Sequence, residues 1–293
     1  MFSNFNVGQL DAPYDCNITI QEQLNQAYQL GLDVIFVTNH NTLDGYRQML
    51  EYKNNHKKFE NIQVFPAEEI TTSDDCHVLV YGINDVIGLG LSLDEVLEEV
   101  RRQNAISSAP HPFGLLDALR ENAIKCDLIE VFNSNNVDIF ANTKATIFAT
   151  RHNMTGVAGS DSHVISTLGR CTNIIESEIK LDDVLSSMRH RKIRINQTGY
   201  ATAKETLEHL SYKIDNSKEY IHEYLSQFYP KSKAFFSLLL KLFEYSPNSI
   251  LWMLFYKFAL FAMKRISKKI NFQNLDPHFL KERNISTMFM TAF

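Results

Sequence analysis

The sequence predicts an α/β fold over residues 1–199, with a parallel sheet or barrel at its centre, followed by a helical region over residues 200–293. Up to about Gly199, short apolar and β-branched runs alternate with segments of helical pattern, which is typical of βαβ units. Several of these apolar runs end in His, Asp, Glu or Asn. Because α/β folds place their chemistry at the carboxyl ends of parallel strands, these polar residues indicate an active site.

The first helix and the first strand carry clear local signals. Thr19 and Glu22 form a capping box and Gly31 is a typical residue after a helix, so we expect a helix over residues 19–30. The continuous apolar run over residues 33–38 is typical of a strand buried on both faces. The same patterns predict strands at 62–65, 77–82, 105–109, 127–132 and 193–197, and a further strand in the run that ends at Gly159. They predict helices at 44–59, 92–103, 137–153 and 181–191. Residues 1–15 are expected to form a loop or an incomplete strand.

Composition narrows the class of protein. The net charge of −5 argues against a general nucleic-acid coat protein. The four cysteines form no Cys-x-x-Cys pair, which fits a reducing, cytoplasmic compartment. Residues 1–7 show neither the basic nor the apolar segment of a signal peptide. We therefore expect a cytoplasmic protein, with a peripheral membrane location as the alternative.

The helical region contains two apolar runs, at 234–243 and 250–263, which are rich in Phe, Leu and Tyr and are separated by Pro247. Each run is shorter than the ~20 residues that a membrane-spanning helix needs. One interpretation is a packed helical hairpin or a surface that binds a partner. The other is an interfacial helix on a membrane, with basic residues facing the lipid headgroups. Residues 234–269 are therefore a candidate for membrane-surface or protein contact, and the basic residues concerned are Lys264, Arg265, Lys268 and Lys269. The oligomeric state stays open.

The histidines fall into two groups. His40, His77, His111 and His163 each flank an apolar, strand-like run, and Glu69 and Asp161 occupy equivalent places. Buried imidazoles and carboxylates need partners, and a metal cluster supplies them. Nitrogen and oxygen ligands suit zinc, manganese or iron. The sequence therefore predicts a metal site. Five other histidines are expected on the surface: His56, His152, His190, His209 and His222. His278 lies in a tail without an assigned element.

Five motifs with polar residues follow one another along the chain: Thr38-Asn39-His40-Asn41-Thr42, Glu68-Glu69-Ile70-Thr71-Thr72, His77-Val78, Ala109-Pro110-His111-Pro112-Phe113 and Gly159-Ser160-Asp161-Ser162-His163. Their order resembles that of the PHP family, the polymerase and histidinol phosphatase domain. The resemblance covers about residues 15–199. It implies a distorted (β/α)7 barrel and a metal-dependent phosphoesterase with two or three divalent metal ions in the mouth of the barrel.

The resemblance also implies roles for single residues. Glu69, His77 and His111 correspond to the ligands of one metal. Asp15, His40 and His163 correspond to those of a second metal. Asp161 and a bridging Glu69 serve a third. The expected catalytic residues are Asp161, His163 and Arg170.

Three residues near these motifs have two interpretations each. Arg170 is a candidate to contact a substrate phosphate, with a surface salt bridge as the alternative. Asn133 and Asn135 either bind substrate or cap the helix that follows them.

The sequence departs from the family pattern at two places. The family opens with a His-x-His pair, but the corresponding positions here are Val7-Gly8-Gln9, so either the pair is lost or the first strand lies upstream. Asn39 stands where the family usually has Asp, and we expect it to hold His40 by a hydrogen bond.

Two functions follow. The first is hydrolysis of a phosphate monoester or a short oligonucleotide phosphodiester, with the region after Tyr200 as a candidate lid. The second is a catalytically impaired metal-binding barrel that acts as a binding module through its helical tail.

Overall fold

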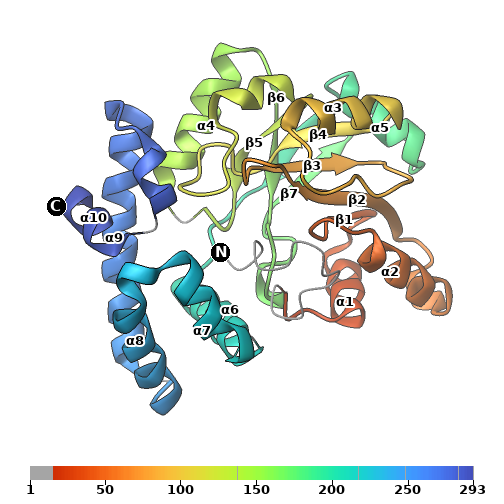
Figure 1. Cartoon of the computed structure of the whole chain (residues 1–293). Coiled ribbons are helices and arrows are strands. Elements are labelled where there is room, and N and C mark those ends of the chain that lie inside the picture. Colours follow the sequence, from red (N-terminus) through yellow and green to blue (C-terminus); the bar gives the residue numbers. More distant parts are fainter. Residues whose placement is uncertain (1–15, 137, 217, 248, 283, 293) are drawn as a thin grey trace.

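The computed structural model describes residues 16–136, 138–216, 218–247, 249–282 and 284–292 (Figure 1). A six-stranded sheet in the order β1-β2-β3-β4-β5-β6 forms the centre of the molecule, and a two-stranded sheet of β7 and β8 lies beside β6. Asn173 of β7 joins the two sheets, because its side-chain amide exchanges two hydrogen bonds with the backbone of Ala158. The strands are Val34–Val37, Gln63–Thr71, His77–Tyr81, Ile106–Ala109, Leu128–Asn133, Thr155–Gly159, Thr172–Ile175 and Ile193–Gln197, numbered β1 to β8.

The predicted α/β class is confirmed, but the expectation of a wholly parallel sheet is wrong at one strand. β3 runs antiparallel to both β2 and β4, whereas β1–β2 and β4–β5–β6 pair in parallel. Only residues 72–76 connect β2 to β3, and a parallel crossover needs a dozen residues or more. As a result the start of β3 pairs with the end of β2, His77 opposite Thr71. The sheet is a curled half-barrel, and the seven-fold (β/α) repeat stays a prediction.

Helices cover the sheet much as the sequence predicts. Thr19 and Glu22 form the capping box of the first helix and Gly31 ends it with a φ of 65°. The helix expected over residues 44–59 ends earlier, and a 3-10 turn, Lys57–Phe59, follows it. These helices are α1 Ile20–Leu30, α2 Asp44–Asn54, α3 Leu93–Arg102, α4 Ile139–Arg151 and α5 Leu181–Arg189.

The apolar core follows this arrangement. One cluster joins α3 and α4 to β2, β3 and β5 through residues such as Val96, Ala145 and Ile129. A second cluster joins α1 and α2 to β1, with Leu24 and Met49 almost completely buried. A third cluster packs α5 on the opposite face of these strands through residues such as Phe65. Apolar side chains therefore cover both faces of the sheet, which leaves the strand ends as the place for polar side chains.

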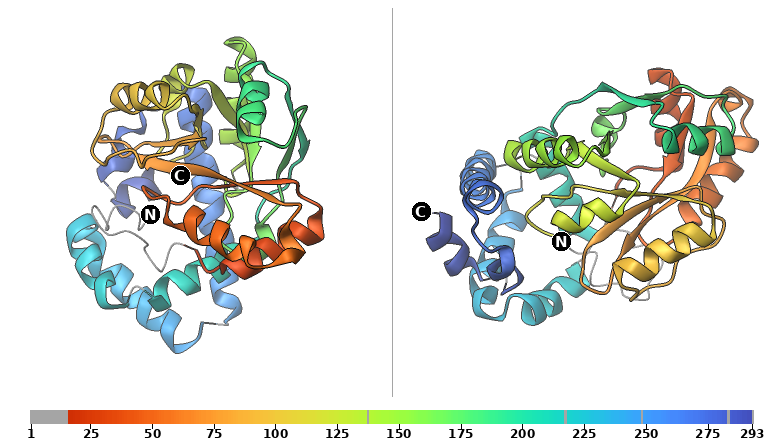
Figure 2. Two further views of the ribbon diagram at one scale, coloured as in Figure 1. Left: turned by 90° about the vertical axis from the view of Figure 1, so that its right-hand side faces the viewer. Right: turned by 90° about the horizontal axis from the view of Figure 1, so that it is seen from above.

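The described residues after Tyr200 fold as helices, as predicted (Figure 2). They lie on the side of the sheet away from α1 and α2. α9 packs on the sheet domain, where Ser267 donates a hydrogen bond to Asp138 and Asn271 donates one to the carbonyl of Phe113. The division into domains at residue 199 stays a prediction. These helices are α6 Ala203–Asn216, α7 Lys218–Phe228, α8 Lys233–Tyr245, α9 Ile250–Gln273 and α10 Ile285–Ala292.

Candidate metal centre

Four elements bring acidic and imidazole side chains to one edge of the sheet. Glu69 lies near the end of β2 and His77 begins β3. His40 follows β1 and forms an isolated parallel bridge with Glu69, while His111 follows β4. Because β3 is antiparallel, its first residue reaches the edge at which the parallel strands end. The reversal of β3 is therefore the reason that His77 lies beside Glu69.

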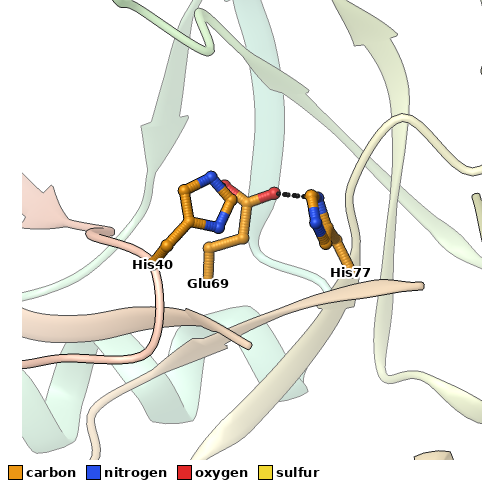
Figure 3. Close-up of side chains that lie close together, drawn as sticks. All are labelled: His40, Glu69 and His77. Atoms are coloured by element: carbon orange, nitrogen blue, oxygen red, sulfur yellow. Dashed lines mark ion pairs between the residues drawn. The ribbon is translucent and has the colours of Figure 1, made fainter. Parts of the chain in front are cut away.

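The Glu69 carboxylate lies between the side chains of His40 and His77 (Figure 3). Its Oε1 lies 3.0 Å from Nδ1 of His77 and 3.4 Å from Nε2 of His111. Its Oε2 lies 3.8 Å from Nε2 of His40. The ring centroid of His77 lies 5.0 Å from that of His40 and 5.4 Å from that of His111. Three imidazoles thus surround one carboxylate that is only 9% exposed.

Electrostatics favour the ionised form of this carboxylate. Burial alone raises the pKa of Glu69, but the three imidazoles around it outweigh burial and hold the pKa well below its usual range. Burial lowers the pKa of His111, yet its contact with Glu69 and the negative charge of Asp161 raise that pKa to about 9. The Glu69 carboxylate therefore stays negatively charged, and a metal ion bound by His111 would displace the proton that this ring holds at neutral pH.

The donor set fits a divalent metal ion. One ligand atom each from His40, Glu69 and His77 can be chosen so that all lie within 4.8 Å of one another. Nε2 of His77 is buried and makes no hydrogen bond to any residue in the described part of the chain. A buried imidazole nitrogen without such a partner costs free energy, and a metal ion would remove that cost. Nitrogen and carboxylate donors without a thiolate suit zinc, manganese or iron.

Asp161 and His163 lie in the loop after β6 and line one pocket, together with Asn135, Ser160, Val164, Thr167, Ala201, Glu205, Thr206 and His209. Both residues lie beyond the last residue of β6, and Asp161 has a φ of 45°. His111 has a φ of 30°. Positive φ values at residues other than glycine concentrate at functional sites, because the surrounding structure has to hold them there.

Glu130 of β5 links the two parts of the site, and sequence reasoning missed it. Its Oε2 accepts hydrogen bonds of 2.9 Å from the backbone N–H of His111 and from Nδ2 of Asn133. The same Asn133 nitrogen lies 3.3 Å from Oδ2 of Asp161. Burial raises the pKa of Glu130 to about 7. A glutamate inside the apolar run over residues 128–132 is the signal that could have identified it.

Two neighbouring residues complete this network. Gly159 leaves room for Glu130, because a Cβ atom at this glycine would overlap the Glu130 carboxylate. The Oδ1 atom of Asn133 accepts hydrogen bonds from the backbone N–H groups of Asn135 and Asn136. Asn133 therefore shapes the turn after β5 and also orients Asp161.

α6 forms one wall of the pocket. Arg170 binds Glu205 of α6 through two hydrogen bonds of 2.8 and 2.6 Å, and it also donates to the carbonyls of Tyr200 and Ser166. This geometry matches the salt-bridge interpretation of Arg170. His209, also on α6, stacks on His163 with ring centroids 4.4 Å apart. The prediction that His209 is a surface residue is wrong, because the tertiary fold brings α6 over the loop of Asp161.

The ion pair of Glu205 predicts a pH dependence of stability. Burial raises the pKa of Glu205, but hydrogen bonds from Thr202 and Arg170 outweigh it and lower the pKa to about 2. The pKa of Glu205 is lower in the folded protein than in the unfolded chain. The Glu205–Arg170 pair therefore stabilises the fold above about pH 4.5, and this stabilisation is lost as the pH falls toward 2. We expect Glu205→Gln to lower the melting temperature at pH 7, and the gap to the parent protein to narrow below pH 4.5. A gap that stays constant from pH 7 to pH 3 in thermal unfolding would contradict this.

The remaining predicted site residues have different outcomes. Asp15 and residues 7–9 lie outside the described residues. The side-chain amide of Asn39 lies against Gly45, and its predicted hydrogen bond to His40 stays a prediction. The assignment of ligands to a first, second or third metal also stays a prediction. Four histidines are exposed, as predicted: His56, His152, His190 and His222.

Comparison with known proteins places the chain in a family. A family model described as PHP-associated matches residues 140–193, which include the loop of Asp161 and His163. The uncharacterised protein MJ1587 of Methanocaldococcus jannaschii is 32% identical over 125 residues, which are 42% of this chain and 70% of that protein. The chain belongs to the PHP family. A second relative is the uncharacterised protein MJ0417 of the same organism, 31% identical over 143 residues, which are 45% of this chain and 60% of that protein.

Solved structures are similar to this PHP protein at lower identity. PsfC from Pseudomonas syringae matches with a TM-score of 0.47 and 19% identity, over 68% of this chain and 88% of PsfC. The lesion-specific endonuclease EndoQ from Pyrococcus furiosus matches with a TM-score of 0.48 and 14% identity, over 62% of this chain and 55% of EndoQ.

Proposed function

We propose that this PHP protein is a metal-dependent phosphoesterase that hydrolyses a phosphate monoester or a phosphodiester of a short oligonucleotide. The observation that carries the proposal is the buried Glu69 carboxylate surrounded by the imidazoles of His40, His77 and His111. A purely structural core would not gather three imidazoles around one carboxylate, because each polar group would have to be desolvated.

The proposed ligands come from both parts of the site. His40, Glu69, His77 and His111 hold two or three divalent ions, zinc, manganese or iron, together with Asp161, His163 and the family-implied Asp15. Such ions supply an activated water molecule for attack on phosphorus and offset the negative charge on the phosphoryl oxygens.

The residues of the chain have separate tasks in this proposal. Glu69 balances the charge of the cluster, and Glu130 holds the backbone of His111 in place through its 2.9 Å hydrogen bond. Asn133 orients Asp161 toward the pocket. The phosphoryl group lies against Asp161 and His163, and His209 of α6 closes the pocket on the other side. α6 belongs to the region after Tyr200 and thereby serves as the lid expected from that region.

Metal content tests the proposal without knowledge of the substrate. We expect protein purified without chelator to contain two or more equivalents of zinc, manganese or iron by elemental analysis. His77→Ala is expected to lose most of this metal. His152 is an exposed histidine at the C-terminal end of α4, and His152→Ala is expected to keep the metal. Absence of metal from the parent protein, even after reconstitution, would contradict the proposal.

Activity assays then separate the two functions. The reconstituted protein is expected to hydrolyse p-nitrophenyl phosphate or bis-p-nitrophenyl phosphate, and His77→Ala is expected not to. Full metal content without hydrolysis of either ester, or of a panel of nucleotides and sugar phosphates, would favour the catalytically impaired binding module.

His209 provides a separate prediction about the pocket. Because its ring stacks on His163 and lines the pocket, His209→Ala is expected to raise KM for the phosphate ester by roughly tenfold, the loss of about 1.4 kcal/mol of binding. The metal content is expected to stay unchanged. His222→Ala on α7, with an exposed side chain, is the matched control. An unchanged KM in steady-state kinetics would place His209 outside the substrate pocket.

A further inference from the structure

The helices α8 and α9 expose an apolar surface at the end where they meet. Their inner faces pack on the rest of the molecule, as shown by the cluster of Phe243 and Trp252 with Ile214 of α6. Their outer faces leave large side chains in solvent, with Tyr245 91%, Ile250 75% and Leu251 66% exposed. We call this surface the hairpin tip, and it comprises Phe235, Leu238, Leu242 and Tyr245 of α8 and Ile250, Leu251, Leu254 and Phe255 of α9.

The spacing of these residues shows that they form one face of each helix. On α8 they recur at intervals of three and four residues, which places them on one side of a helix with 3.6 residues per turn. On α9 they form two adjacent pairs separated by one turn. The turn between α8 and α9 lies at the end of the helical region that is farthest from the sheet (Figures 1 and 2). The hairpin tip can therefore reach a flat surface without hindrance from the sheet domain.

Charge distinguishes between the candidate occupants of this surface. Residues 229–257, which include α8 and the first turns of α9, contain four Lys and one acidic residue, Glu244, although the whole chain has a net charge of −5. Lys233, Lys241 and Lys257 are exposed on the same two helices as the apolar side chains. A second copy of this chain would bring the same positive charge to the contact, and like charges would oppose it. An anionic lipid surface offers both an apolar interior and negative headgroups.

We propose that the hairpin tip binds an anionic lipid bilayer and inserts its apolar side chains into the interfacial region. None of the described helices is long and apolar enough to cross a membrane, so the contact is peripheral. Tyr245 carries an aromatic ring with a polar end, a residue type enriched at the membrane interface. The basic side chains lie beside the headgroups, where each adds up to about 1 kcal/mol of attraction that salt weakens.

The only tryptophan of the chain provides a direct reporter. Trp252 stands in the first turn of α9, stacks edge-on against Phe243 at 5.2 Å and donates a hydrogen bond to the carbonyl of Ser246. It therefore lies next to the residues proposed to enter the bilayer. Quenching of its fluorescence by lipids brominated on the acyl chain would report insertion, whereas simple electrostatic adsorption would leave it unquenched.

The test uses the full chain with vesicles of phosphatidylcholine alone or mixed with phosphatidylglycerol. We expect flotation with the mixed vesicles, weaker flotation at high salt, and quenching of Trp252 by brominated lipid. The triple variant Leu242→Ser, Ile250→Ser, Leu251→Ser is expected to bind at least about tenfold more weakly, since it removes exposed apolar area. The triple variant Ile124→Ser, Ile147→Ser, Ile179→Ser removes equally large exposed side chains elsewhere and is expected to bind like the parent.

Three results would overturn the proposal. The first is no flotation with anionic vesicles at low salt. The second is flotation that the hairpin-tip variant does not weaken. The third is a dimer in light scattering that the same variant dissociates, which would assign the surface to a contact between copies of the chain.

Discussion

Glu69→Gln is expected to weaken metal binding by at least about 100-fold. Loss of a residue that only hydrogen-bonds to a metal ligand already lowers metal affinity by about 10- to 100-fold, and Glu69 is proposed as a ligand itself. Gln keeps the size of the side chain but removes the negative charge that three imidazoles surround. Without this charge, the pKa of His111 is expected to fall below about 9, since Glu69 is the main group that raises it. Binding is measured by titration of the metal-free protein with zinc or manganese, and the His111 pKa by NMR.

The neighbouring residue supplies a matched control. Glu68 is also buried, but it points to the opposite face of β2, where its Oε2 accepts a hydrogen bond of 3.1 Å from the backbone of Ile87. We expect Glu68→Gln to bind metal like the parent protein. Equal metal affinities of Glu69→Gln and Glu68→Gln would show that Glu69 is not a ligand and would remove the basis of the proposed function.

Glu130→Leu is expected to affect both stability and metal binding. Its carboxylate accepts hydrogen bonds from two buried donors, and leaving a buried donor without an acceptor costs about 1–3 kcal/mol. The release of a buried carboxylate offsets part of this cost, so we expect a net loss of about 2 kcal/mol in chemical denaturation of the metal-free protein. Because the backbone of His111 and the side chain of Asn133 lose their anchor, metal affinity is expected to fall by about 10- to 100-fold.

A second substitution displaces the Glu130 carboxylate by steric overlap. In Gly159→Ala the added methyl group overlaps the Glu130 carboxylate and forces it to move, so metal affinity is expected to fall here too. Glu121→Leu, at an exposed glutamate, is the control and is expected to leave both properties unchanged. Parent-like metal affinity in both Glu130→Leu and Gly159→Ala would show that the Glu130 network does not position the site.

The sequence by itself determined the α/β class, most elements and the residues of the candidate metal centre. Caps such as Thr19 with Glu22 and continuous apolar runs act over a few residues, so the local sequence is sufficient to predict them. His40, Glu69, His77 and His111 could be selected because polar residues at the ends of buried runs have few structural explanations. The same local rules failed for β7, Thr172–Ile175, whose four residues carry too weak a pattern.

Only the tertiary structure decided how these residues meet. The reversal of β3 places His77 beside Glu69, and a strand direction depends on pairing partners that no local pattern encodes. Glu130 joins His111 to Asp161 through contacts between residues far apart in sequence. His209 reaches His163 because packing of the helical region lays α6 over the pocket. Contacts of this kind arise from long-range packing, and the sequence specifies them only through the fold as a whole.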